Sequence, residues 1–150
     1  MHDETENNLI QYLKKFKGKS GLYIIKVKPN KLHILEDISM KLFGYPPKSN
    51  IAYVGKGSCL KTTDLYSRSK QEMGWSNFEG ATFMKKIGRY LGYKIEDKKN
   101  ILARKNTREF IIQTFDVECI EHKTNESLLA WEREMIIKLK SCLNSNKNNF

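Results

Sequence analysis

The chain has 150 residues, about the length of one domain, so we expect a single domain over residues 1–150. Its 27 Lys and Arg against 17 Asp and Glu give a net charge of +10, which makes nucleic acid the leading partner class. A hydrophobic fraction of 39% excludes a disordered polyelectrolyte. No apolar run approaches the ~20 residues of a membrane span, and the polar start is no signal sequence, so we expect a cytoplasmic protein.

The first part of the chain predicts one helix and two strands. Leu9 and Leu13 belong to an amphipathic helix that, with a basic linker, occupies residues 1–19. Residues 21–27 (GLYIIKV) are rich in β-branched and aromatic residues, which predicts a strand, and residues 51–55 (IAYVG) predict a second. Between the two strands we expect a small helix or an irregular excursion.

The middle and the end of the chain alternate helices with one more strand. Thr63 or Asp64 can cap a helix that reaches about Met73, and a loop over 74–80 precedes a helix over 81–93. The charged stretch 96–106 is expected to be irregular, with Thr107 capping a short helix after it. A third strand is predicted over 116–122, and the last helix is predicted from Asn125 or Glu126 to Lys140. The remaining expectation is a polar tail over 145–150.

The last helix carries a carboxylate in an apolar stripe. At 100° per residue, Glu132 falls near the middle of a stripe formed by Leu128, Trp131, Met135, Ile136 and Leu139. An unpaired buried carboxylate is costly, so Glu132 should meet a cation, a metal or hydrogen-bond donors. A structural salt bridge to an arginine and a functional role both remain open. Arg68 and Glu72, four residues apart, fit a simple helical ion pair.

Both predicted strands carry a tyrosine close to glycine. The first contains Gly21-Leu22-Tyr23, and the second contains Tyr53-Val54-Gly55 followed by Lys56 and Gly57. Glycines allow close approach of a ligand to the backbone, and Lys56 between them is well placed for a phosphate. Trp75, Phe78 and Tyr90, with nearby lysines and arginines, are either core residues or surfaces for base stacking.

The order of these features resembles the GIY-YIG nuclease superfamily. Gly21-Leu22-Tyr23 stands for GIY and Tyr53-Val54-Gly55 for YIG, followed by Arg68, Glu132 and Asn144, and the resemblance covers about residues 20–145. It implies an α+β fold with a small three-stranded antiparallel sheet flanked by helices, to which this chain adds an N-terminal helix. This chain differs from the family pattern at Glu72, where many members carry His or Tyr.

The resemblance implies hydrolysis of phosphodiester bonds with one divalent metal, Mg²⁺ or Mn²⁺, and gives the site residues their expected roles. Glu132 is the expected metal ligand, Arg68 the phosphate ligand, and Tyr23 and Tyr53 the candidates to activate or orient the attacking water. The expected catalytic residues are Tyr23, Tyr53, Arg68 and Glu132, the substrate-binding residues are Gly55, Lys56 and Asn144, and the supporting residues are Glu72 and His122.

Three questions about these roles stay open in the sequence. The sequence does not separate the two tyrosines. Glu72 either holds Arg68 or holds a water or metal, and Asn144 is either a turn residue or a contact in the site. DNA is the expected substrate, with RNA and branched DNA as variants, and a nucleic-acid-binding module of the same fold that does not cleave is the alternative function.

Overall fold

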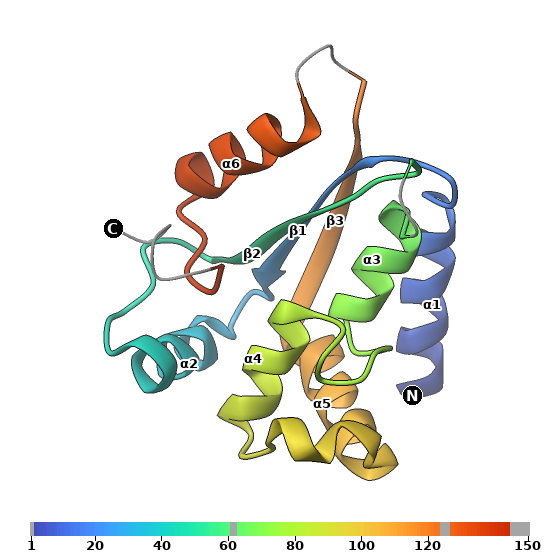
Figure 1. Cartoon of the computed structure of the whole chain (residues 1–150). Helices are drawn as coiled ribbons and strands as arrows, with labels where there is room; N and C mark the ends of the chain where they lie inside the picture. The colour runs from blue at the N-terminus through green and yellow to red at the C-terminus, as the bar shows by residue number, and fades with distance from the viewer. Residues whose placement is uncertain (1, 61–62, 124–126, 145–150) are drawn as a thin grey trace.

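Three strands form the centre of the fold. The computed structural model describes residues 2–60, 63–123 and 127–144. In it, β1 (Gly21–Val27) lies between β2 (Ile51–Gly57) and β3 (Phe115–Glu121) and pairs antiparallel with both (Figure 1). The chain is therefore an α+β protein with the three-stranded antiparallel sheet that the sequence predicts.

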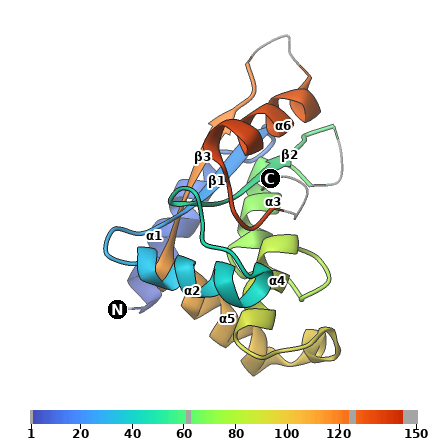
Figure 2. The ribbon, with the colours of Figure 1, turned by 90° about the vertical axis from the view of Figure 1, so that its left-hand side faces the viewer.

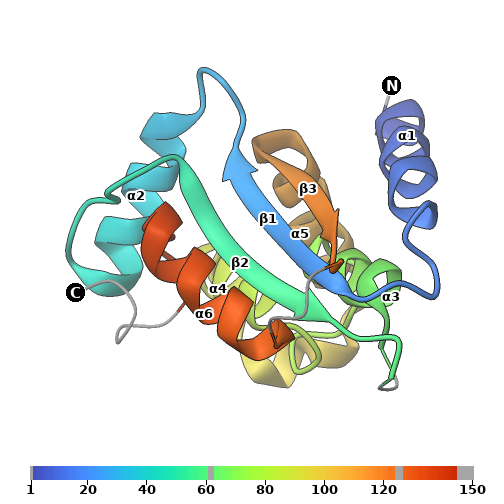
Figure 3. The same cartoon turned by 90° about the horizontal axis from the view of Figure 1, so that it is seen from above.

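Helices cover both faces of this sheet. They are α1 (His2–Lys14), α2 (Leu32–Phe43), α3 (Leu65–Glu72), α4 (Thr82–Tyr90), the short 3-10 helix η1 (Ile95–Lys99), α5 (Ile101–Thr114) and α6 (Leu128–Leu139). One face carries α6, which lies along β2 (Figure 3). The other face carries α3, α4 and α5, with α1 against α3 and α5 and with α2 beside α4 (Figure 2).

Strand alternation divides the core between the two faces. Leu22, Ile24 and Val54 point toward α6 and pack with Ile136. Tyr23 and the other side chains of the opposite parity join the larger cluster under α3, α4 and α5. The predicted stripe of α6 is confirmed, because its remaining apolar side chains pack at the edge of the smaller cluster.

Polar caps explain where several helices begin. Asp64 caps α3 as predicted, since its side chain accepts a hydrogen bond from the Ser67 N–H. Ser127 caps α6, because its side chain accepts a hydrogen bond from the Ala130 N–H. The predicted first residues of this helix, Asn125 or Glu126, lie outside the described residues. The predicted tail over 145–150 also lies outside them.

The sequence prediction is wrong at α5. This helix begins after Asn100, whose side chain accepts from the Ala103 N–H, and it includes part of the stretch expected to be irregular. Thr107 lies in the helix interior rather than at its start, and its hydroxyl donates to the Ala103 carbonyl. None of the helices in the described part of the chain is long and apolar enough to cross a membrane.

Candidate active site

Tyr23 lies in the core with its hydroxyl on a buried carboxylate. It faces Gly55 in the β1–β2 register, and a Cβ on Gly55 would lie 2.2 Å from the Tyr23 ring. Glycine at this position therefore makes room for the ring to cross β2. The Tyr23 hydroxyl then reaches α3, where it donates to Glu72 Oε2 at 3.0 Å.

Both oxygens of Glu72 have partners, although its side chain is completely buried. Oε1 accepts from the backbone N–H groups of Phe83 (2.8 Å) and Met84 (3.3 Å) at the start of α4. Oε2 accepts from Tyr23 and lies 3.8 Å from Arg68 Nη2. These contacts favour the first of the two alternatives for Glu72, in which it holds Arg68.

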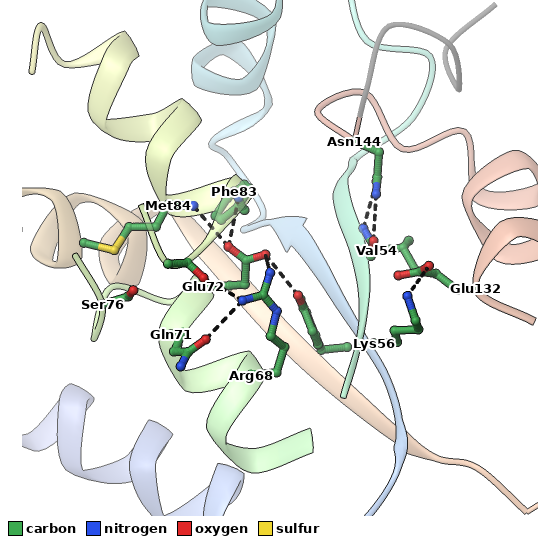
Figure 4. Close-up of polar contacts among 12 residues, drawn as sticks. Val54, Lys56, Arg68, Gln71, Glu72, Ser76, Phe83, Met84, Glu132 and Asn144 are labelled. Atoms are coloured by element: carbon green, nitrogen blue, oxygen red, sulfur yellow. Dashed lines mark hydrogen bonds and ion pairs between the residues drawn. The ribbon is translucent and has the colours of Figure 1, made fainter. Parts of the chain in front are cut away.

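Arg68 is fixed by neutral acceptors as well as by Glu72. Its Nη1 donates to Gln71 Oε1 at 3.1 Å and to the Gly80 carbonyl at 2.6 Å (Figure 4). Its side chain remains 25% exposed. The guanidinium is therefore held in one orientation at the surface while its planar fork can still reach an anion. No pattern in the sequence indicates the contact with Gly80, whereas Gln71 lies at the i, i+3 spacing of a helical neighbour.

Tyr53 lies on β2 beside the buried network of Tyr23 and Glu72. Its ring stacks on Tyr23 with centroids 6.2 Å apart, and its side chain shares a hydrogen bond with Thr82. The charges of Glu72, Arg68 and Glu132 all act on its hydroxyl. Tyr53 is 8% exposed and Tyr23 1%, so Tyr53 is the tyrosine nearer to solvent.

Burial sets the protonation state of both tyrosines. Burial, with the Glu72 charge as the next cause, raises the pKa of Tyr23 well above its ordinary value of 10.0. The same two causes raise the pKa of Tyr53. Both hydroxyls are therefore protonated at neutral pH in this structure, and each can donate a hydrogen bond.

Glu132 and Lys56 form an ion pair on the other side of β2. Lys56 Nζ lies 3.2 Å from Glu132 Oε1, and the Glu132 side chain is 15% exposed. The expected cation is thus a lysine from β2 rather than an arginine. Figure 4 shows Lys56 and Glu132 on one side of the β2 ribbon, and Arg68 and Glu72 on the other.

Asn144 binds the free edge of β2. Its Nδ2 donates to the Val54 carbonyl at 2.7 Å, and its Oδ1 accepts from the Val54 N–H at 2.9 Å. Lys86 on α4 donates to the carbonyls of Leu143, at 2.7 Å, and Asn144. Both residues therefore fix the end of the described chain next to Tyr53, and the contacts of Lys86 have no signal in the sequence.

The other residues that the sequence singles out lie outside the Arg68–Glu72 ion pair. The His122 ring stacks on Trp131, the neighbour of Glu132, with centroids 5.5 Å apart. Gly55 is buried beside the Tyr23 ring. The supporting role of His122 and the substrate-binding roles of Gly55 and Lys56 stay predictions. Phe78 is a core residue, with 2% of its surface exposed.

The donor set determines which kind of metal site is available. Among the described residues, no three His, Cys, Asp or Glu side chains gather into a cluster that could hold a metal. Glu132 nevertheless fits a hard divalent cation, because Mg²⁺ binds one or two carboxylates and keeps several waters. Only Oε1 of its two oxygens faces Lys56 Nζ, and 39% of the Lys56 side chain is exposed. The lysine therefore has space to move aside.

A sequence comparison identifies the family of this chain. The profile of the GIY-YIG catalytic domain matches residues 21–150, so the chain belongs to the GIY-YIG family. No curated protein and no solved structure matches the chain significantly. Membership indicates endonuclease activity in general, a nucleic-acid substrate that is typically DNA, and use of a divalent metal.

Proposed function

We propose that this protein is a metal-dependent endonuclease that hydrolyses phosphodiester bonds of DNA. The observation that carries the proposal is the position of Tyr53. Its hydroxyl interacts electrostatically with both Arg68 and Glu132. An anchored guanidinium, a phenol and a carboxylate around one strand provide the groups that phosphodiester hydrolysis requires. The net charge of +10 favours the approach of a polyanion.

Arg68 binds the scissile phosphate in this proposal. Its contacts to Gln71, Glu72 and Gly80 fix the guanidinium before substrate arrives, so little conformational entropy is lost on binding. The positive charge then offsets the negative charge that develops on the phosphoryl oxygens in the transition state. Lys56 provides a second cation at the same strand, on the α6 side.

Tyr53 orients the attacking water, and the stacked ring of Tyr23 holds the Tyr53 ring in place. A protonated hydroxyl donates to an oxygen, so Tyr53 can hold either the water or a phosphate oxygen in place. Tyr23 already donates to Glu72, which leaves its hydroxyl committed within the core. Glu132 would hold the metal, and a bound Mg²⁺ or Mn²⁺ would supply stabilisation of the charge on the leaving oxygen.

Plasmid cleavage tests this function directly. We expect the parent protein to nick supercoiled DNA with Mg²⁺ or Mn²⁺. Glu132→Gln keeps the size of the side chain and removes its charge, and it should lower the cleavage rate by roughly 100-fold or more, as should Arg68→Ala. DNA binding in EDTA should survive in both variants, because the remaining basic surface is intact.

Matched controls separate the site from general charge effects. Glu134→Gln removes a negative charge from an exposed position of α6, and Arg89→Ala removes a positive charge from an exposed position of α4. Both variants should cleave DNA at the parent's rate. If the parent binds DNA but cuts neither plasmid nor branched substrates with either metal, the nuclease proposal is wrong. The binding module would then be the better description, with Lys56–Glu132 as a structural ion pair.

A further inference from the structure

A basic cavity lies behind the loop that holds Arg68. It has a volume of about 290 Å³, and its lining includes Trp75 and Ser76 of the 74–80 loop and Arg104, Lys105 and Arg108 of α5. Gly74 has a φ of +121°, and a Cβ there would lie 2.5 Å from Arg108 Cβ. The loop therefore rests directly on α5 (Figure 1). Arg104 and Arg108 of this helix line one wall of the cavity.

Two of the three cations of this cavity have no acidic partner among the described residues. Arg108 has Glu6 as a counter-ion, with Nε 3.4 Å from Oε1, and its guanidinium lies 5.3 Å from the Trp75 ring. In contrast, Arg104 and Lys105 have no carboxylate within ion-pair distance among the described residues. Arg104 Nε is also buried without a hydrogen-bond partner in the described part of the chain.

A buried donor without a partner is unfavourable, so a water, an ion or a ligand that accepts its hydrogen bond would stabilise it. The chemistry here fits a phosphate. Arg104 offers a planar fork of donors, and Lys105 offers an exposed ammonium one residue away. Ile101 and Trp75 add apolar surface beside these cations, which suits the sugar and base of a nucleotide better than a free inorganic ion.

The cavity is connected to the candidate active site through the loop itself. The Gly80 carbonyl at one end of the loop accepts from Arg68, and Trp75 at the other end lines the cavity. The Trp75 N–H also donates to the Lys70 carbonyl on α3, the helix that carries Arg68. A group bound in the cavity would therefore restrain the segment that positions the guanidinium.

We propose that Arg104 and Lys105 bind a backbone phosphate of the nucleic-acid substrate outside the cleavage site. The proposal rests on the proposed function for the identity of the ligand as nucleic acid. The proposal does not require cleavage. The lining of the cavity comes from α5 and the 74–80 loop and includes none of the candidate catalytic residues. The site would anchor the substrate and add a salt-sensitive contribution to its affinity.

Salt-dependent binding in EDTA tests this proposal separately from catalysis. The double variant Arg104→Gln/Lys105→Gln should bind a labelled DNA duplex roughly tenfold more weakly at low salt, measured by fluorescence anisotropy. The slope of log affinity against log salt should become shallower by about one, the value for one lost phosphate contact. Lys26→Gln, compared with the single variant Lys105→Gln, is the charge-matched control, because Lys26 is an exposed cation of β1 with the parity that faces α6.

A local reporter distinguishes a specific site from loss of net charge. In a Trp131→Phe background Trp75 is the remaining tryptophan, and its fluorescence should change when the duplex binds. That change should be absent with Arg104→Gln/Lys105→Gln and retained with Lys26→Gln. Circular dichroism should show the parent's helix content, and the exposed single variant Lys105→Gln repeats the test if the double variant unfolds.

Each contrary result has a definite meaning. Parent-like affinity and salt slope in a folded double variant, or no DNA binding by the parent, would overturn the anchor. A saturable response of Trp75 to inorganic phosphate without any response to DNA would also overturn it, and would assign the cavity to the free ion. Loss of the anchor with normal plasmid nicking would leave the proposed function standing. If the parent binds DNA, the double variant loses the expected affinity and no nicking occurs, the nuclease proposal fails and the phosphate anchor stands.

Discussion

At the scale of single residues, Glu72 connects the elements around the candidate site. Its carboxylate joins three elements, because it binds Tyr23 of β1, Arg68 of α3 and the first N–H groups of α4. Burial raises its pKa, while Arg68 and the donors around it oppose that shift. A carboxylate at the start of a helix is also favoured by the helix dipole. Glu72 therefore lies beside Arg68 without itself reaching the surface, and we propose that it positions the guanidinium.

Substitution of Glu72 should separate its structural contacts from its charge. Glu72→Ala leaves the Tyr23 hydroxyl and two N–H groups without an acceptor, which should lower the free energy of unfolding by about 3 kcal/mol or more. Glu72→Gln keeps an acceptor for α4 and should cost less. Urea denaturation measures both. Glu79→Ala, at an exposed surface pair with Lys98, should change stability by less than about 1 kcal/mol. Equal stabilities for Glu72→Ala and the parent would contradict this role.

The two tyrosines should respond differently to loss of their hydroxyls. Tyr53→Phe removes the group proposed to orient water, so cleavage should fall by roughly 100-fold or more with little change in stability. Tyr23→Phe removes a buried donor from Glu72, so its free energy of unfolding should fall by about 1–3 kcal/mol. Single-turnover cleavage rates and urea denaturation make the comparison. Cleavage by Tyr53→Phe at the parent's rate would rule out the assignment.

At the scale of elements, the start of α3 depends on Asp64. One carboxylate oxygen accepts from the Ser67 N–H and the other from the Gly18 N–H, each at 2.7 Å. Burial acts to raise the pKa of Asp64, but these hydrogen bonds outweigh it and leave the pKa below its ordinary value. The aspartate therefore stabilises the folded state when ionised, and it ties the basic linker to the helix that carries Arg68.

Two variants of Asp64 test this cap. Asp64→Ala should lower the free energy of unfolding by about 1–2 kcal/mol. Because the folded pKa lies below the unfolded value, the ionic contribution is present above 3.8 and is lost as pH falls through the folded pKa. Asp64→Asn does not titrate, so its stability deficit should shrink with acidification below that value. A deficit that stays constant over this range of pH would contradict the linkage.

The elements also show which features the sequence could predict. The strands and α6 have dense β-branched runs or a clear apolar stripe, and the predictions are confirmed there. The interior face of α5 includes Ala103 and Thr107, which do not read as a stripe, so the charged residues dominate the pattern. The buried Thr107 hydroxyl is satisfied by the Ala103 carbonyl, which makes a polar residue acceptable inside the helix.

At the scale of the whole molecule, the sequence shows which residues need partners but not which partners they meet. The stripe position of Glu132 predicts a cation, a metal or hydrogen-bond donors. The choice of Lys56 follows from the register of β2 beneath α6. The segment after α6 is a similar case. The N–H groups of Cys142 and Leu143 donate to carbonyls of β2, so this segment covers the strand's outer edge. Carbonyl acceptors of this kind have no signature in the sequence.

Lys86 connects this segment to α4 on the other face of the sheet. Its ionisation should therefore affect the free energy of unfolding. Burial and the Arg89 charge lower its pKa from 10.5 to about 8. A lysine whose pKa is lower in the folded state binds less proton there than in the unfolded chain. Its charge therefore opposes folding below about pH 8, and that opposition is relieved as pH rises toward 10.5. The hydrogen bonds to Leu143 and Asn144 act in the opposite direction by favouring the ordered segment.

The difference in stability between the parent and Lys86→Gln isolates this effect, because the other titrating groups are common to both proteins. Between about pH 8 and 10.5, the free energy of unfolding of the parent should rise relative to that of Lys86→Gln, which cannot titrate. Urea denaturation across this range measures both proteins. A constant difference between the parent and Lys86→Gln would mean that folding does not shift the pKa of the ammonium, and it would contradict the effect of burial.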